Sequence, residues 1–311
     1  MLKIYKSNEE AMFQEQSESV HYNWVQLTNP SEEEIQNAAS RFGVPADFIR
    51  DPLDADERSR IEKNEDNLLF IINVPLKMAD GESVPYRTIP IGIIQTRDVM
   101  ISICRVNHPI LQELSKKTVK PFLTKVNTHF LFQLLLLSSR YYLHLLDDIN
   151  QKIIDAEKKL QKSIRNSDLY TLLNINKSLV FFSKSLKVNR IMMQKLSRIQ
   201  RFEIKEENEK LMQAAFIEMQ QALDTSEIYN ENLGNMMDAY SAAIENNLSA
   251  VVKVLTAFTV IFTFPLVVAS IYGMNFPLPV QDGVYTLAVL MLIGGVISLG
   301  TGWIFYKKRL F

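Results

Sequence analysis

The sequence predicts an α/β domain followed by a long helical stalk and two C-terminal transmembrane helices. Strand-type patterns occur only before about residue 118, and helical patterns take over from Pro121. Charged residues are dense up to Lys253, whereas 254–306 contains a single charge, Asp282. Two long apolar runs lie within that last segment, which is the arrangement expected of membrane-spanning helices.

Residues 1–118 are predicted to form the α/β domain, with a mixed sheet. The stretches 67–76 (NLLFIINVPL) and 89–104 (IPIGIIQTRDVMISIC) are rich in Ile and Val and are broken by Pro, Gly and charges, which is typical of strands. The stretch 29–43 reads as a helix, because Ser31 and Glu34 can form a capping box and Gly43 can terminate it.

This domain carries no recognisable catalytic cluster, so an enzyme is not expected. Cys104, the only cysteine, lies in an apolar run and is predicted to be a buried, reduced thiol. The net charge of −1 suggests no nucleic-acid partner, and the opening MLKIYKSNEE lacks the apolar core of a cleavable signal peptide. No GxxxxGK[ST] loop is present, so neither nucleotide binding nor ATP hydrolysis is expected.

Residues 119–250 are predicted to form the helical stalk. The expected helices cover about 122–165, 167–202 and 206–272, and the second has capping candidates in Asn166, Ser167 and Asp168. A continuous last helix would be roughly 100 Å long at about 1.5 Å per residue and would run from the cytosol into the membrane. The apolar run 130–137 (FLFQLLLL) is too short to span a bilayer and is expected to be a buried helix face.

The two transmembrane helices are placed at 251–272 and 284–306. Their uncharged runs of nineteen (254–272) and twenty-three residues match the roughly 20 that a helix needs to cross the hydrocarbon. The alternative is a buried helical hairpin in a soluble protein. Gly294, Ser298 and Gly302 recur every four residues and would let two membrane helices approach closely, unless they are merely scattered small residues.

The basic residues predict the orientation in the membrane. Lys253 precedes the first span, and a basic tail at 307–311 follows the second, whereas the loop 273–283 has no Lys or Arg. The positive-inside rule therefore places both termini in the cytoplasm and the loop outside. The chain is thus expected to be a multi-pass protein of the plasma (inner) membrane, in contact with the lipid bilayer.

A seven-residue periodicity runs along the third predicted helix into the first span. A repeat of this kind usually marks the face that a long helix turns toward copies of itself in a bundle. An oligomer is implied if it lines a pore; the alternative is a solvated coiled-coil face. Its members are Asp238, Glu245, Val252, Thr259 and Leu266, with Ser241, Leu248, Leu255 and Phe262 at the interleaved positions.

The chain resembles the CorA family of divalent-cation transporters. The resemblance rests on the motif Tyr272-Gly273-Met274-Asn275 at the outer end of the first span, within FPLVVASIYGMNFP, and on two C-terminal spans with a basic tail. It covers the whole chain in architecture. It implies a homopentameric funnel in which the first spans line the pore and the second spans form an outer ring.

The resemblance also implies site residues. Gly273, Met274 and Asn275 would form the external selectivity site, with Asn275 as a ring of ion-binding amides, and Asp238 would bind metal near the cytosolic end. Asn275 could equally be a simple helix cap, and the threonines of the pore could bond back to their own helix. The positions that would face the pore are Val252, Leu255, Thr259, Thr263 and Leu266.

The implied function is channel-like uptake of Mg²⁺, with Co²⁺ or Ni²⁺ as further candidates, gated by cytosolic Mg²⁺. Neutral carbonyls suit an ion that retains its water, because conduction needs sites weak enough for release. The membrane potential alone can drive entry, at about 4.6 kcal/mol for a divalent ion per 100 mV. Ala214 and Ala215 stand where an acidic regulatory residue is expected, with Glu218 one turn further on.

Two alternatives remain open. One is a Zn²⁺ transporter of the related branch, in which the methionine of the motif is typically replaced; Met274 argues against it. The other is a non-conducting, membrane-tethered sensor or scaffold. Purified protein in liposomes would separate these functions by its ion flux.

Overall fold

The computed structural model describes residues 2–7, 13–16, 24–79, 81–97, 99–116, 128–162, 165–196, 206–274 and 285–307. The chain divides into two compact units, Met1–Asn235 (unit 1) and Met236–Phe311 (unit 2). Helix α6 (Glu206–Tyr272) contributes to both.

Unit 1 is built on a mixed seven-stranded sheet of order β2-β1-β3-β7-β6-β5-β4. The β3–β7 pair is parallel and the other pairs are antiparallel, which confirms the predicted mixed sheet. The expected strand at 89–104 is two strands, β6 and β7, joined by a turn at Thr96–Val99. The strands are β1 (Leu2–Ser7), β2 (Phe13–Gln16), β3 (Trp24–Thr28), β4 (Arg60–Asn64), β5 (Asn67–Lys77), β6 (Tyr86–Gln95) and β7 (Met100–Cys104).

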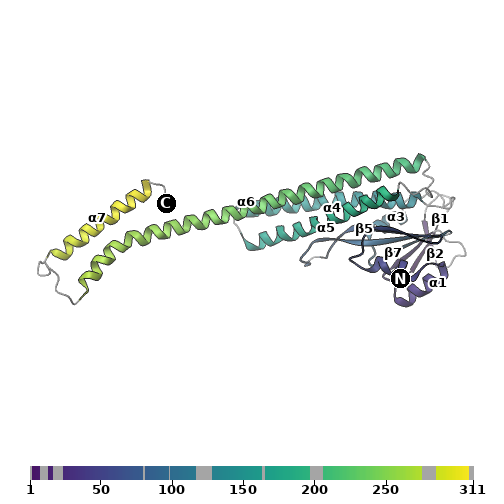
Figure 1. The fold of residues 1–311 in the computed structure, drawn as a ribbon, viewed down its shortest axis with the longest axis horizontal. Helices are drawn as coiled ribbons and strands as arrows, with labels where there is room; N and C mark the ends of the chain where they lie inside the picture. Colours follow the sequence, from purple (N-terminus) through teal and green to yellow (C-terminus); the bar gives the residue numbers. More distant parts are fainter. Residues whose placement is uncertain are drawn as a thin grey trace. The chain divides into compact units, whose positions relative to one another are not determined.

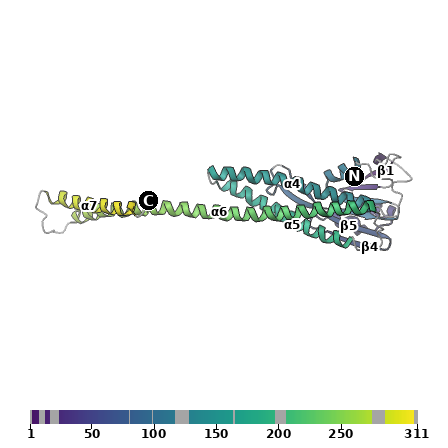
Figure 2. The same ribbon diagram turned by 90° about the horizontal axis from the view of Figure 1, so that it is seen from above.

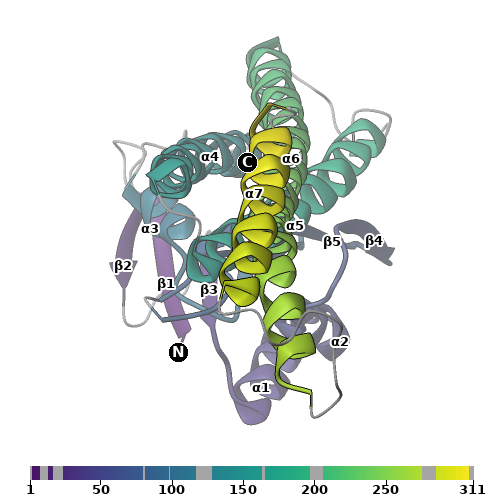
Figure 3. The same ribbon diagram turned by 90° about the vertical axis from the view of Figure 1, so that its left-hand side faces the viewer.

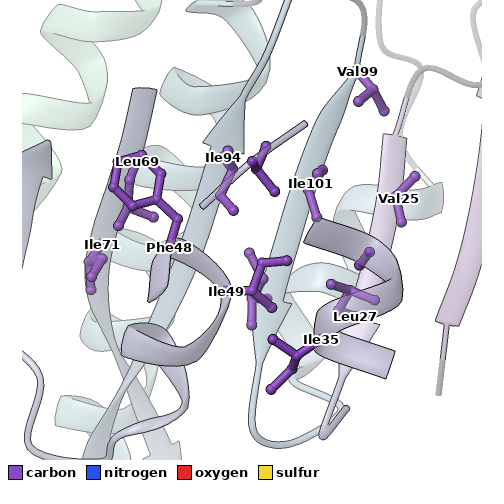
Figure 4. Packing of buried hydrophobic residues seen from close by; sticks show 13 residues of the cluster. Val25, Leu27, Ile35, Phe48, Ile49, Leu69, Ile71, Ile94, Val99 and Ile101 are labelled. Carbon is purple, nitrogen blue, oxygen red and sulfur yellow. The ribbon is translucent and has the colours of Figure 1, made fainter. Parts of the chain in front are cut away.

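One face of the sheet packs against α1 (Glu32–Phe42), α2 (Ala46–Arg50) and the short 3-10 helix η1 (Asp51–Leu53). Figure 4 shows side chains of α1 and α2 pointing onto alternate residues of the strands, such as Leu69 and Ile71 of β5. The predicted capping box of Ser31 and Glu34 is present, and Gly43 ends α1 in the left-handed conformation.

The opposite face packs against the helices α4 (Thr128–Lys162) and α5 (Asn166–Leu196), as Figures 1 and 2 show. Phe70 and Ile72, the residues of β5 between those of the first face, are also buried. Burial on both faces explains why β5 reads as a continuous apolar run. The edge-to-face contact of Trp24 with Phe130 joins this face to α4, and the indole N–H of Trp24 donates to Ser102 Oγ on the neighbouring strand β7 (2.9 Å).

A buried polar network connects β5 to both of these helices. Asn189 of α5 donates through Nδ2 to the carbonyl of Asn73 (2.7 Å), and its Oδ1 accepts from the Asn73 backbone N–H (3.1 Å). The hydroxyl of Tyr142 on α4 donates to the same carbonyl (2.9 Å). Such fully bonded groups fix the helices against the strand without leaving buried polar atoms unpaired.

The long helices follow the predicted order; α6 has the predicted bounds, whereas the described parts of α4 and α5 are shorter than expected. The expected ends at 122–127, 163–164 and 197–202 lie outside the described residues, as does the segment before Glu206. The run 130–137 is largely buried, as predicted, and so is Cys104, whose thiol pKa burial raises to about 11. A short helix, α3 (Pro109–Lys116), precedes α4.

The sequence boundary at residue 118 corresponds to the change from strands to helices rather than to a gap in the packing. Helices α4 and α5 lie directly on β5 and β6, so the sheet and the helices form one unit. In unit 2, the C-terminal part of α6 and helix α7 (Thr286–Lys307) run alongside each other (Figure 3).

Candidate ion-conduction path

Two helices of the described chain are long and apolar enough to cross a membrane. Their most apolar windows lie within Asn208–Ile271 and Ala288–Lys307, at mean hydropathies of 2.3 and 2.0. Only 6% and 11% of these windows are buried, which a core helix of a soluble protein would not show. The buried helical hairpin considered as an alternative is therefore not what the chain forms.

Small residues of α7 face α6, as their spacing predicted. A Cβ built on Gly294 would lie 3.5 Å from Val268 Cγ2, and one on Gly302 would lie 3.4 Å from Ile261 Cδ1. Between them, Ser298 donates from Oγ to the carbonyl of Ile261 (2.8 Å). The prediction that the small residues at positions 294, 298 and 302 let α7 approach another membrane helix closely is thus confirmed within one chain.

The positions expected to face the pore lie on the other side of α6. At about 100° per residue, the side chains at these five positions, which are named below, point within about 50° of the direction opposite the face that α7 covers. They are exposed in the single chain, Val252 by 51% and Leu266 by 69%. Helix α6 therefore presents one covered face and one open face, and the open face carries Val252, Leu255, Thr259, Thr263 and Leu266.

The two threonines on this open face bond back to their own helix. Thr259 Oγ1 donates to the carbonyl of Leu255 (2.9 Å), and Thr263 Oγ1 donates to the carbonyl of Thr259 (2.7 Å). Of the two roles considered, the structure shows the helix bond. Each hydroxyl oxygen keeps its acceptor lone pairs, so it can still accept hydrogen bonds from the water shell of a cation.

Pro265 lies inside α6, within the first predicted span. A proline has no N–H, so the carbonyl of Ile261 loses its helix partner, and this is the carbonyl to which Ser298 donates. From the sequence, Ser298 was expected only to be a small residue of the packing face. A proline within an apolar span was the available signal, because it predicts an unpaired carbonyl four residues earlier.

The predicted motif is described only in part. Helix α6 ends at Tyr272, and Gly273 and Met274 follow it, whereas Asn275 and the rest of the loop to residue 284 lie outside the described residues. Helix α6 thus ends directly before Gly273, whose φ is not positive: the described glycines with positive φ are Gly43 and Gly81. The Gly273 N–H instead donates to Ala269 O (3.0 Å), continuing helix-type bonding.

Acidic residues before the span are exposed but do not gather in one chain. Asp238 and Glu245 are both solvent-exposed. Glu218, one turn beyond Ala215, forms an ion pair with Arg140 (Nε–Oε1, 3.3 Å), and Ala215 is buried. Within the described residues, no three His, Cys, Asp or Glu side chains come together in a way that could hold a metal ion.

The apolar helix pair and its open face define an integral membrane protein with a folded, charged N-terminal unit. The family described as "CorA-like Mg2+ transporter protein" matches residues 19–309. That match covers most of the chain, so the chain belongs to this family.

Known proteins with similar sequences and folds agree with this assignment. A protein of Methanocaldococcus jannaschii named cobalt/magnesium transport protein CorA is 27% identical over 294 residues, covering 90% of this chain and 91% of the relative. A protein of the same name from Thermotoga maritima is 23% identical over 296 residues, covering 92% and 82%. The complete structure of the CorA magnesium transporter from M. jannaschii superposes with a TM-score of 0.83 at 24% identity, covering 99% of this chain and 98% of that one, so the fold is shared.

Proposed function

We propose that the chain forms a channel-like transporter for Mg²⁺ uptake, with Co²⁺ or Ni²⁺ as further cargo. Mg²⁺ is the substrate here, and family membership supports this choice of ion. The observation that carries the proposal is the open face of α6, which lies opposite the face that α7 covers. A single helix cannot enclose a path, so the open faces of several copies must meet around an axis.

The assembly we propose is a homopentamer with α6 in an inner ring and α7 in an outer ring. The exposed Val252 and Leu255 would form an apolar constriction that closes by excluding water. Beyond it, Thr259 and Thr263 would offer hydroxyl oxygens to the water shell of the ion. Mg²⁺ gives up its water reluctantly, which suits a path lined by hydrogen-bond acceptors rather than by direct ligands.

Asn275 is proposed as the selectivity ring at the external mouth, next to Gly273 and Met274. Its amide carbonyls would hold the hydrated ion without a formal charge, so that the ion can leave again. The support is the position of the motif directly after the last turn of α6.

The test is uptake of Mg²⁺ into liposomes that contain the purified protein, with an inside-negative potential. Asn275→Ala should lower the initial rate at least about tenfold, which corresponds to about 1.4 kcal/mol. Asn247→Ala is the matched control, because it removes an exposed amide of α6 outside the pore-facing set and should leave the rate unchanged. Wild-type flux from a correctly assembled Asn275→Ala protein would contradict the selectivity ring.

The same vesicles test the alternative functions, and the protein in detergent tests the assembly. Zn²⁺ uptake that exceeds Mg²⁺ uptake would favour a zinc transporter, and no flux of any of these ions would favour a scaffold. Counting subunits in detergent by native mass measurement should give five. A different number would overturn the pentamer even if flux is observed.

Feedback by cytosolic Mg²⁺ is part of the proposal. Exposed Asp238 side chains of neighbouring copies would repel one another near the axis unless cations lie between them. Internal Mg²⁺ should therefore favour a closed, tight bundle by shifting a population. Flux and protease sensitivity of the stalk that do not change with millimolar internal Mg²⁺ would show that this chain lacks the feedback.

The proposed orientation places both termini in the cytoplasm of an inner (plasma) membrane. The support is the basic residues Lys253 and Lys307 at the inner ends and none in the loop. A cysteine at Gln281, with Cys104 replaced by serine, should react with an impermeant reagent on intact cells. Reaction only after permeabilisation would reverse this topology.

A further inference from the structure

One carbonyl in the middle of the apolar part of α6 lacks the usual helix partner four residues further on. The N–H that would bond to Ile261 O belongs to position 265, which is proline. Hydrocarbon offers no water to replace the lost bond, so such a carbonyl in a membrane helix must find a donor in a neighbouring element.

Ser298 on α7 is that donor. Its Oγ lies 2.8 Å from Ile261 O, and the side chain is only 6% exposed. Four threonines in the apolar parts of α6 and α7 bond differently, because each donates to a carbonyl four residues earlier on its own helix. Those that do so are Thr256, Thr259, Thr263 and Thr301.

The glycines on either side of Ser298 allow this contact. Gly294 and Gly302 each lie about one helical turn away on the same face of α7. A Cβ on Gly294 would already touch Val268, and one on Gly302 would touch Ile261, so larger side chains there would push the helices apart. The two glycines thus keep the serine hydroxyl within bonding distance of the unpaired carbonyl.

We propose that Ser298 is a positioning residue for the conduction path. Its hydroxyl takes the place of the helix bond that Pro265 removes, and so holds the outer end of α6, from Leu266 to the Gly273–Met274 motif, in one position against α7. The effect on flux rests on the proposed function. The effect on the helix pair does not, because the bond is a property of unit 2 alone.

A double-mutant cycle tests this pairing. Ser298→Ala should lower Mg²⁺ uptake in liposomes by at least about threefold, the size expected for an average hydrogen bond between membrane helices, and should lower the melting temperature in detergent. Pro265→Ala restores an N–H that can bond to Ile261 O within the helix. In that background Ser298→Ala should therefore have little further effect on either measurement.

Thr301→Val is the matched control, because it removes a hydroxyl of α7 that bonds to Ile297 within the same helix. It should change uptake and melting temperature less than Ser298→Ala does. Equal effects of Ser298→Ala with and without Pro265→Ala would overturn the proposal. If the wild-type protein carries no Mg²⁺, the proposed function fails, and the melting temperatures alone then test the pairing. A smaller effect of Ser298→Ala on the melting temperature in the Pro265→Ala background supports the pairing, and an equal effect overturns it.

Discussion

The two units of this chain handle polar and apolar groups in opposite ways. In unit 1, the amides of Asn73 and Asn189 are buried and bonded within the same chain. In unit 2, large apolar side chains stay exposed, among them Leu255 (65%), Phe262 (66%) and Leu266 (69%). An apolar surface of this kind needs hydrocarbon or another protein surface against it. The core of unit 1 therefore closes within one chain, whereas the apolar surface of unit 2 needs hydrocarbon or another protein surface to cover it.

The largest expected effect of this difference is on solubility. A fragment of residues 1–235 should stay monodisperse and unfold cooperatively without detergent, because its core closes within one chain. The full chain should aggregate under the same conditions, since each large apolar side chain left in water costs about 1.5–3 kcal/mol relative to burial. Size-exclusion chromatography of both proteins is the measurement. An aggregating fragment, or a full chain that stays dispersed in detergent-free buffer, would break the comparison.

The next effect is the response of unit 1 to acid, through His108. The Ile110 N–H donates to its Nδ1 (3.2 Å), so the ring proton lies on Nε2 and bonds to Pro75 O (2.9 Å). Burial lowers the pKa of His108 to about 4. The unfolded chain then binds a proton that the folded one does not, so the free energy of unfolding should fall by about 3 kcal/mol as the pH drops from about 6.5 to about 4.

Denaturant unfolding of the 1–235 fragment at several pH values measures this loss. His108→Gln cannot titrate in this range, so its stability should decline less steeply than that of the wild-type fragment over the same window. Other groups titrate in both proteins, and only the difference between the two profiles reports on His108. Parallel profiles would show that the buried ring contributes nothing to the acid response.

A smaller effect is expected from a steric change in the closed core of unit 1. A Cβ on Gly92 of β6 would clash with the ring of Pro52 in η1, so Gly92→Ala must displace η1 from the sheet. We expect a loss of about 1–3 kcal/mol in the free energy of unfolding. Gly234→Ala meets no atom within 4 Å and serves as the control, with no loss expected. Comparable stability of the two variants would show that Pro52 can move away from position 92 at little cost in free energy.

Local patterns in the sequence predicted much of the fold. The capping box at Ser31, the helix end at Gly43 and the strand at 67–76 follow from interactions among neighbours in the chain, and all are present, the strand with one more residue. The two apolar helices and the packing stripe of α7 were also predictable, because length, hydropathy and side-chain size are properties of each segment. The turn that separates β6 from β7 was missed, since apolar residues continue on both sides of it.

The candidate path has features that local sequence patterns could not predict. The seven-residue repeat identified one face of α6, but only the packing of α7 showed that this face is the open one. Helix α6 ends directly before Gly273, yet this glycine does not adopt a positive φ, because glycine permits a left-handed turn without requiring it. The Asn275 ring stays a prediction.

The sequence by itself determined the long helices of this protein, their order and the division between a charged part and an apolar part. Periodicity, caps and hydropathy act over a few residues, so they can be read from the chain. The tertiary structure decided which groups become partners across long separations, such as Tyr142 with Asn73 and Ser298 with Ile261. These pairs depend on how two helices or a helix and a strand approach each other, and that approach is set by the packing of many side chains at once.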